Sequence, residues 1–272
     1  MALRAADGAA ADVYLHGAHV TSWRPTPDGD ERLFLSSRSE FRTGEAIRGG
    51  IPVIFPQFAA EGPLPRHGFA RTAEWHLDRV TSPASGDAAA TLTLTDSPES
   101  LAVWRASFEA TLTVRVGGSR LVVELRVRNA GSSPLSFTGA LHTYLRVHDV
   151  AQAEVRGLQG ARYRDAADRT RLRADESPVL RVTGELDRVY VDAPKALLVR
   201  EPRRALRVET REFPDVVVWN PGRKRAAALS DMESDGERAM LCVEAAVVQT
   251  PVTLETGAVW SGSQSLDAGV QA

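Results

Sequence analysis

The chain has 272 residues, 43% hydrophobic and 25% charged, which is the composition of a globular protein with a large core. Its 33 basic and 35 acidic residues leave a formal charge of -2, so the composition gives no basic field for nucleic acid. Cys242 is the one cysteine, which excludes an intramolecular disulfide framework and is consistent with a reducing compartment. Lys195 and Lys224 are the only lysines, so Schiff-base chemistry has few candidate residues.

Residues 1–17 do not begin with basic residues followed by an apolar stretch, as a secretory signal peptide would. No apolar run approaches the ~20 residues that a membrane-spanning helix needs. We therefore expect a soluble protein of the cytoplasm with no membrane partner.

Strand patterns dominate the chain. Ala88–Thr95, Phe108–Val116 and Leu121–Asn129 alternate apolar and polar residues, as half-buried strands do, and residues 117–119 (Gly-Gly-Ser) predict a hairpin between the last two. Further short strands are expected at Leu135–Val147, Ala196–Arg200, Leu206–Thr210, Val216–Asn220, Met240–Val248 and Val252–Thr256.

Helical patterns are scarce, with single turns expected at Pro98–Leu101 and Glu237–Met240. The sequence contains no repeat of 20–50 residues and no linker of convincing length. Many short strands separated by turn residues predict an all-β fold, a large β-sandwich that residues 1–272 form as a single domain.

The common catalytic and metal motifs are absent. The sequence has no phosphate loop of the Gly-x-x-x-x-Gly-Lys type, no dinucleotide fingerprint and no Gly-x-Ser-x-Gly elbow. His16 and His19 would lie on opposite faces of a strand, and His142 and His148 lack a carboxylate at matching spacing. We therefore predict no metal site.

Two loop segments carry candidate binding residues. Arg48–Phe58 contains two glycines and two prolines between the polar residues Arg48 and Gln57, and is either a buried crossover loop or the wall of a pocket. Arg66–Arg71 follows a rigid Pro-Leu-Pro stretch and surrounds His67 with cations, which is typical of an anion or sugar site. The chain is rich in arginine everywhere, so this second pattern is weak alone.

Two strand segments each place one polar residue among apolar neighbours. His142 lies in Leu141–Leu145, where a histidine is usually a satisfied core residue. Glu244 lies in Leu241–Val248, and burying its carboxylate would cost several kcal/mol. Glu244 must therefore face a polar cleft, hold a partner or keep its proton, which makes it a candidate general base.

Taken in order, several segments resemble the aldose 1-epimerase (mutarotase) superfamily, and most closely its hexose-6-phosphate branch. The resemblance covers nearly the whole chain. It rests on Leu15–Trp23, Leu33–Ser36, Arg48–Pro52, Phe55–Phe58, His67–Arg71, Ala140–Tyr144, Gly157–Leu158, Tyr163–Asp165, Val217–Pro221, Asp231–Met232, Val243–Glu244 and Trp260–Gly262.

The resemblance implies a galactose-mutarotase-like β-supersandwich and a reaction without cofactor or metal. It implies His142 as general acid and Glu244 as general base for interconverting the anomers of hexose 6-phosphates, glucose 6-phosphate first. The substrate-binding residues that it implies are Arg48, Gln57, Arg66, His67, Arg71 and Asp187, with Arg48 and Arg71 on the phosphate or hydroxyls.

Two of the departures from the family pattern bear on the substrate. Arg66 stands where an amide side chain is expected, and Gly222 where an aromatic residue often follows the proline. Three alternatives stay open: a free-aldose mutarotase, a sugar-binding protein that has lost catalysis, and a glycosidase or lyase, which would need two flanking carboxylates. We expect a monomer whose partner is a small sugar phosphate.

Overall fold

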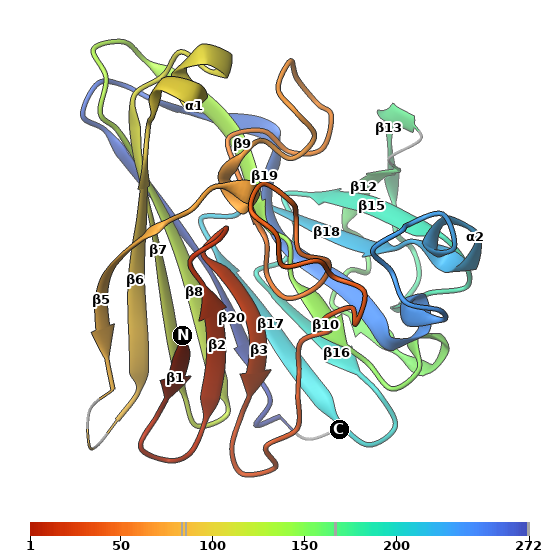
Figure 1. Cartoon of the computed structure of the whole chain (residues 1–272). Helices are drawn as coiled ribbons and strands as arrows, with labels where there is room; N and C mark the ends of the chain where they lie inside the picture. Colours follow the sequence, from red (N-terminus) through yellow and green to blue (C-terminus); the bar gives the residue numbers. More distant parts are fainter. Residues whose placement is uncertain (83, 85, 166–167, 271–272) are drawn as a thin grey trace.

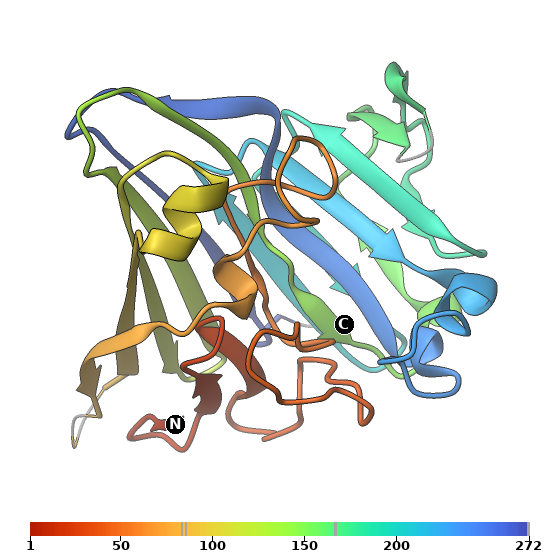
Figure 2. The ribbon, with the colours of Figure 1, turned by 45° about the horizontal axis from the view of Figure 1, so that its top comes forward.

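The computed structural model describes residues 1–82, 84, 86–165 and 168–270 and is built mainly from β-strands. The strands form antiparallel sheets of nine, eight and three strands. The two large sheets lie on either side of the main hydrophobic core (Figures 1 and 2), which confirms the all-β sandwich. No helix in the described ranges is both long and apolar enough to span a membrane.

The nine-stranded sheet contains the most regular of the predicted strands. Its strand order is β14 (Val179–Arg181), β11 (Glu154–Arg156), β16 (Ala196–Arg200), β17 (Ala205–Arg211), β20 (Val259–Asp267), β8 (Arg120–Asn129), β7 (Phe108–Gly117), β6 (Ala88–Thr95) and β5 (His76–Thr81). Buried residues alternate with more exposed ones along β6, β7 and β8, because one face of this sheet packs on the core. The predicted hairpin is confirmed, since β7 and β8 pair up to Gly117 and Arg120.

The eight-stranded sheet carries many of the residues that line the candidate site. Its order is β13 (Asp168–Ala174), β12 (Arg162–Asp165), β15 (Leu186–Val191), β18 (Asp215–Asn220), β19 (Met240–Leu254), β9 (Leu135–Leu141) and β4 (Val53–Ile54), with β10 (Tyr144–Arg146) also paired to β19. All of β18 and the first nine residues of β19 are buried, because both faces of the sheet are covered.

The outer face of this sheet carries a second apolar cluster, which we call the pocket-side cluster. It consists of Phe34, Ile54, Phe58, Ala140, Tyr144, Val189, Val217, Trp219, Ala226, Met232, Met240, Cys242, Ala246 and Val248. The inner face contributes instead to the main core between the large sheets, which includes residues from Leu3 to Leu266.

The remaining elements are short. The third sheet consists of β1 (Ala2–Arg4), β2 (Ala10–Tyr14) and β3 (His19–Arg24), and the helical elements are α1 (Pro98–Val103), α2 (Gly222–Ala226), η1 (Ala70–Thr72), η2 (Val150–Gln152) and η3 (Gly236–Ala239). Ser97 caps α1 in a reciprocal pair with Ser100, and Pro98 opens the helix. The two predicted helical turns are therefore found as α1 and η3.

The expected strand Leu135–Val147 is interrupted where His142 and Thr143 leave the ladder. The backbone N–H of His142 donates to the carbonyl of Pro52, the residue before β4, at 3.0 Å. The Thr143 hydroxyl instead hydrogen-bonds Gln264 in the opposite sheet. The break therefore fixes His142 between two strands rather than within one.

The two expected strands Met240–Val248 and Val252–Thr256 form one strand, β19, with a register shift between Val247 and Val252. The shift surrounds Pro251, which has no N–H for the ladder and is tolerated at an irregularity of this kind. The strand bends there instead of ending.

Candidate active site

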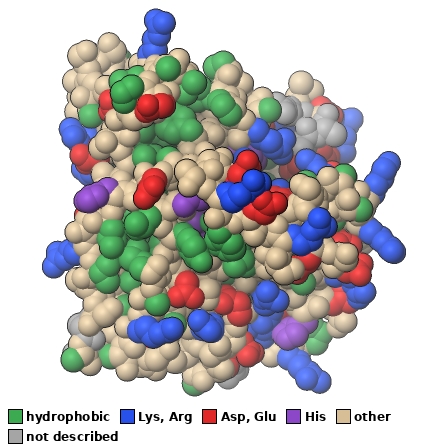
Figure 3. Space-filling model, in the orientation of Figure 1, with side chains coloured by type: hydrophobic (Ala, Val, Ile, Leu, Met, Phe, Trp, Pro, Cys, Tyr) green, Lys and Arg blue, Asp and Glu red, His purple; other side chains and the backbone are tan. Residues whose placement is uncertain are grey.

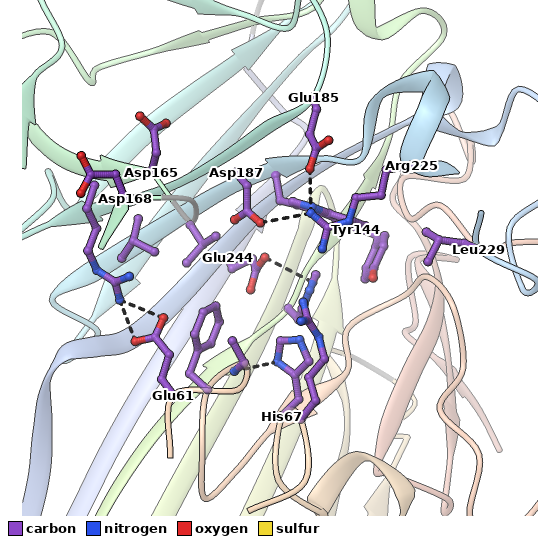
Figure 4. A pocket seen from close by; sticks show the side chains of 18 of the residues that line it. Glu61, His67, Tyr144, Asp165, Asp168, Glu185, Asp187, Arg225, Leu229 and Glu244 are labelled. Atoms are coloured by element: carbon purple, nitrogen blue, oxygen red, sulfur yellow. Dashed lines mark hydrogen bonds and ion pairs between the residues drawn. The ribbon is translucent and has the colours of Figure 1, made fainter. Parts of the chain in front are cut away.

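A cavity of about 880 Å³ lies beside the pocket-side cluster (Figure 4). Seven of the eight residues predicted to form the site line it: Arg48, Arg66, His67, Arg71, His142, Asp187 and Glu244. The fold thus brings together residues that are up to 196 positions apart in the sequence.

The two-residue period of the strands explains how Glu244 reaches the pocket. On β19, Val243 and Ala245 face the main core, whereas Cys242 and Ala246 face the pocket-side cluster. Glu244 shares the parity of the second pair and lines the cavity. The same period brings Val217 and Trp219 of β18, and Asp187 and Val189 of β15, to the cavity wall.

His142 and Glu244 form a close pair on neighbouring segments. Leu141 of β9 is paired with Ala245 of β19, so the next positions along, His142 and Glu244, face each other. The Nδ1 atom of His142 lies 3.4 Å from Oε1 of Glu244, and the two side chains are only 9% and 1% exposed. His142 Nδ1 and Glu244 Oε2 are buried and have no hydrogen-bond partner within the described residues.

Burial shifts both groups toward their uncharged forms. It lowers the pKa of His142 well below 6.5, an effect that His67 and two nearby arginines reinforce. Burial also raises the pKa of Glu244 well above 4.5, and the Asp187 carboxylate adds to this shift. The pair therefore holds one proton over a wide range of pH.

Aromatic rings fix the plane of the His142 imidazole. The Tyr144 ring is stacked on it at 4.8 Å and 10°, and the Trp219 ring meets it edge-on at 5.9 Å. Burial raises the pKa of Tyr144, so its hydroxyl stays protonated. Tyr144 is two residues beyond His142. Residues with this spacing lie on the same face only where the chain is extended, as in a strand.

Arg48 is held at the cavity wall by two partners. Its guanidinium donates to the Tyr144 hydroxyl at 3.0 Å and lies 3.0 Å from the Asp231 carboxylate. Most of the segment after it is buried, since Ile51, Val53–Ile54 and Phe55 belong to the core clusters. The segment is thus mainly a buried crossover, with Arg48 at the pocket.

His67 has left-handed backbone geometry, with φ of 68°. The next residue, Gly68, also has a positive φ, and a Cβ there would lie 2.2 Å from the Phe55 carbonyl oxygen. His67 Nδ1 accepts the Ala59 N–H at 3.3 Å, so the proton of the neutral ring resides on Nε2. Burial, aided by nearby arginines, lowers the pKa of His67 far below 6.5, which keeps the ring neutral.

Gln57 does not line the cavity, although the resemblance implies it as a substrate contact. Its side chain is 4% exposed and binds the loop that follows it. The amide nitrogen donates to the carbonyls of Ala59 and Leu64, and the amide oxygen accepts the Leu64 N–H at 2.9 Å. Gln57 thus has a visible structural role, which is to brace the loop that carries Arg66 and His67.

Asp187 faces the cavity from β15 within a small charged group (Figure 4). Arg225 of α2 lies 3.7 Å from Asp187 and 2.7 Å from Glu185. Burial raises the pKa of Asp187 above 3.8, while Arg225 opposes that shift. Gly222, which starts α2, has φ of 61°, and a Cβ there would lie 2.6 Å from the Glu185 N atom. The close approach of the two loops therefore requires this glycine.

Cys242 adds a thiol beside the pair. One donor atom from each of His142, Cys242 and Glu244 lies within 4.8 Å of the others. Burial raises the pKa of the Cys242 thiol, and the Glu244 carboxylate adds to that shift. Nitrogen, sulfur and oxygen donors of this kind suit zinc, although the sequence predicts no metal.

Three of the four histidines outside the pocket make other contacts. The imidazoles of His16 and His19 bind different backbone carbonyls, those of Glu45 and Gly49. His148 is paired with Glu201 at 3.3 Å, and its side chain is 67% exposed. None of the three lines the cavity.

Comparison with known proteins assigns the chain to a family. A family model described as aldose 1-epimerase matches residues 1–267. The chain belongs to the aldose 1-epimerase family. Members of this family are isomerases, so the chain is an epimerase-type enzyme.

Similar proteins support both the family and the fold. A Cenchrus ciliaris protein named "Putative glucose-6-phosphate 1-epimerase" is 38% identical over 275 residues, covering 98% of this chain and 83% of that protein. An Escherichia coli K12 protein of the same name is 35% identical over 236 residues, covering 85% and 78%. The crystal structure of a "putative mutarotase" from Salmonella typhimurium matches with a TM-score of 0.87 at 29% identity, covering 95% and 86% of the two chains. The predicted galactose-mutarotase-like sandwich is thereby confirmed.

Several residues of this aldose 1-epimerase pocket have no role assigned from the sequence. Tyr144, Trp219 and Asp231 lie in segments that carry the resemblance, yet only the packed structure places them against His142 and Arg48. Glu61 and Arg164, paired at 2.9 Å on the far wall, come from a loop and from β12, and nothing local in the sequence links them.

Proposed function

We propose that the protein interconverts the α and β anomers of hexose 6-phosphates, with glucose 6-phosphate as the main substrate. The observation that carries the proposal is the buried His142–Glu244 pair, 3.4 Å apart, at the wall of an arginine-lined cavity. An acid and a base that share one proton suit a reaction that removes a proton from one oxygen and delivers one to another.

Ring opening breaks the C1–O5 bond of the sugar and forms the C1=O1 carbonyl of the open chain. The Glu244 carboxylate takes the proton from the C1 hydroxyl while the His142 imidazolium gives a proton to O5. Rotation about C1–C2 exposes the other face of the aldehyde, and the reverse transfers close the ring as the other anomer. Each positioned group contributes roughly 10²–10⁴-fold.

The proton of the His142–Glu244 pair changes its position during the reaction. In the reactive form of the ring-closed complex the proton resides on His142, and after opening it resides on Glu244, so both side chains are then uncharged. Burial of the two groups favours the uncharged distribution in the ring-closed complex as well, so the reactive form arises when the proton moves from Glu244 to His142 within the pair. The pair therefore needs no group outside the chain as a proton carrier.

The other cavity residues suit a sugar phosphate. Arg48 and Arg71 can donate charge-assisted hydrogen bonds to an anion, and the Asp187 carboxylate can accept bonds from ring hydroxyls. His67 offers its Nε2–H as a neutral donor. The names of the two relatives above, which specify glucose 6-phosphate, support the same substrate class.

A free-aldose mutarotase is the second candidate, and the charges of the pocket favour it. Among the described residues, four of the six arginines that line the cavity are paired with carboxylates, which weakens their attraction for an anionic substrate. We further propose that the enzyme acts as a monomer in the cytoplasm. The single cysteine is buried and free, in keeping with a reducing compartment.

Anomer exchange measured by NMR saturation transfer tests the substrate. Wild-type protein should accelerate exchange of glucose 6-phosphate with a higher kcat/KM than exchange of glucose or galactose. Equal or faster exchange of the free sugars would assign the free-aldose function instead. Acceleration of none of the three would leave a sugar-binding protein without this catalysis.

A further inference from the structure

Gln264 places an amide in the core between the two large sheets. It lies on β20 of the nine-stranded sheet and is 2% exposed. Its cross-strand partner on β8, Val123, belongs to the main hydrophobic core. Charged side chains, by contrast, are spread over the surface of the molecule (Figure 3). A polar group in an apolar core costs free energy unless it is hydrogen-bonded, so the partners of this amide indicate its role.

Both ends of the Gln264 amide are bonded to the eight-stranded sheet. The Nε2 atom donates to the Val243 carbonyl at 2.9 Å, and the Oε1 atom accepts the hydroxyl of Thr143. The chemistry of the partners determines this orientation of the amide, because a carbonyl can only accept and therefore faces the NH₂ group. Gln264 thus reaches across the core and joins two segments of the opposite sheet.

These two segments carry the proposed acid and base. Thr143 directly follows His142, and Val243 directly precedes Glu244. The Val243 N–H also donates to the Thr143 carbonyl at 3.1 Å. Because neighbouring side chains of an extended chain point to opposite faces, Thr143 and Val243 face the core, while His142 and Glu244 line the cavity.

The strand ladder is interrupted at the same place. The pair of Leu141 with Ala245 and the pair of Tyr144 with Cys242 lie on either side of the break. His142 belongs to neither strand, and its N–H is bonded to Pro52 instead of β19. Ladder hydrogen bonds alone therefore do not fix the spacing of His142 and Glu244, and the two bonds of Gln264 add a constraint there.

We infer that Gln264 is a positioning residue, which holds His142 and Glu244 at the separation that lets both reach the sugar. The inference rests on the proposed function, in which these two side chains are the acid and the base. Gln264 is not among the residues that line the cavity, so it acts through Thr143 and Val243. A fully bonded polar network in a core specifies one arrangement of its members.

Gln264→Met keeps a side chain of similar length and removes both bonds. The matched control is Gln249→Met, because Gln249 is exposed on β19 and does not line the cavity. For Gln264→Met we expect kcat for anomer exchange to fall roughly 10- to 100-fold, since a misplacement of about 1 Å can cost ~10²-fold. KM should stay within about 2-fold, because the residues that bind the sugar are unchanged. Gln249→Met should match wild type in both constants.

The double variant Thr143→Val/Gln264→Met separates positioning from stability. Gln264→Met leaves the Thr143 hydroxyl buried without its partner, so it should unfold at a lower urea concentration than wild type. Replacing both partners by apolar groups should restore much of the urea midpoint, while kcat stays at least ~10-fold below wild type. The double variant also provides the kcat test if Gln264→Met does not fold. Recovery of kcat together with the urea midpoint, or an unchanged kcat in folded Gln264→Met, would overturn the inference.

The NMR resonances of the His142 ring nitrogens test the positioning without catalysis. They are assigned by their loss in His142→Asn, and they report the hydrogen bonds of the imidazole. We expect the Nδ1 resonance to move in the double variant and to stay in place in Gln249→Met. If it moves but the wild type exchanges no sugar, Gln264 positions the pair and the proposed function fails. If it stays in place and kcat is that of wild type, the inference is wrong and the proposed function stands.

Discussion

The imidazole of His142 and the carboxyl of Glu244 lie 3.4 Å apart because two β-segments bring them opposite each other at the wall of the pocket. Neither His142 Nδ1 nor Glu244 Oε2 has a hydrogen-bond partner in the described part of the chain. Buried polar atoms are normally satisfied, and unsatisfied ones in a native fold call for an explanation such as a catalytic role. The relationship therefore favours proton transfer over a purely structural role.

The unused carboxylate bonds predict that Glu244 costs stability. Burial raises the pKa of Glu244 above 4.5 in the folded protein. Below 4.5 Glu244 is protonated in both the folded and the unfolded chain, and as pH rises above that value the folded protein loses stability. Glu244→Gln should unfold at a higher urea concentration than wild type at pH 8, with a smaller difference at pH 5. Glu176→Gln, an exposed change, should show neither effect, and a Glu244→Gln protein less stable than wild type at pH 8 would contradict the raised pKa.

The same shifts predict a broad pH optimum for kcat/KM. The active pair holds one proton, so the acid limb reports a second proton on His142 and the alkaline limb the loss of the proton from Glu244. Burial lowers the first pKa and raises the second, which moves the limbs apart. Free glucose should be the substrate, because a phosphate also titrates near ~6. A narrow optimum between 4.5 and 6.5, the ordinary values of the two groups, would count against the account.

Tyr144 allows the role of ring stacking to be tested. Tyr144→Phe keeps the ring on His142 and removes the hydroxyl that Arg48 binds, whereas Tyr144→Leu removes both contacts. We expect kcat on glucose to fall less than ~3-fold for Phe and at least ~10-fold for Leu, because a misplaced acid loses much of its effect. Thermal unfolding checks that both variants fold. Equal activity of the two would mean that the stack does not orient the imidazole.

Metal removal should leave the enzyme active. The proposed proton transfers use only protein groups, so exhaustive EDTA treatment should not change the rate of anomer exchange. Added Zn²⁺ should inhibit, because the donor atoms of His142, Cys242 and Glu244 that would hold it include the reacting ones. Cys242→Ala should weaken that inhibition. Activity lost to EDTA and restored by one metal would overturn the metal-free mechanism.

The sequence predicts the regular strands well and the short ones poorly. Ala88–Thr95 and Ala196–Arg200 match β6 and β16 in both bounds, because each is a clear run with turn residues beside it. β5 is mostly exposed and β11 has three residues, so neither has a periodicity that could predict it. The break at His142 depends on contacts with Pro52 and with the opposite sheet, which are non-local.

The residues of the candidate site also differ in how far the sequence predicts their roles. Glu244 is conspicuous in the sequence because a carboxylate in an apolar strand needs a reason. The compensation of Arg48 by Asp231, 183 residues away, and the bracing role of Gln57 depend on loops whose paths no local pattern predicts. Which arginine carries uncompensated charge is therefore visible only in the folded chain.

Anomer exchange of glucose 6-phosphate by His142→Asn and Glu244→Gln tests the central claim most directly. NMR saturation transfer should show kcat lowered by at least ~10²-fold in each variant, since each loses one partner of the proton transfer. His148→Asn, which changes an exposed histidine outside the pocket, should retain wild-type exchange. Near wild-type turnover in either folded pocket variant would show that the pair does not carry the reaction.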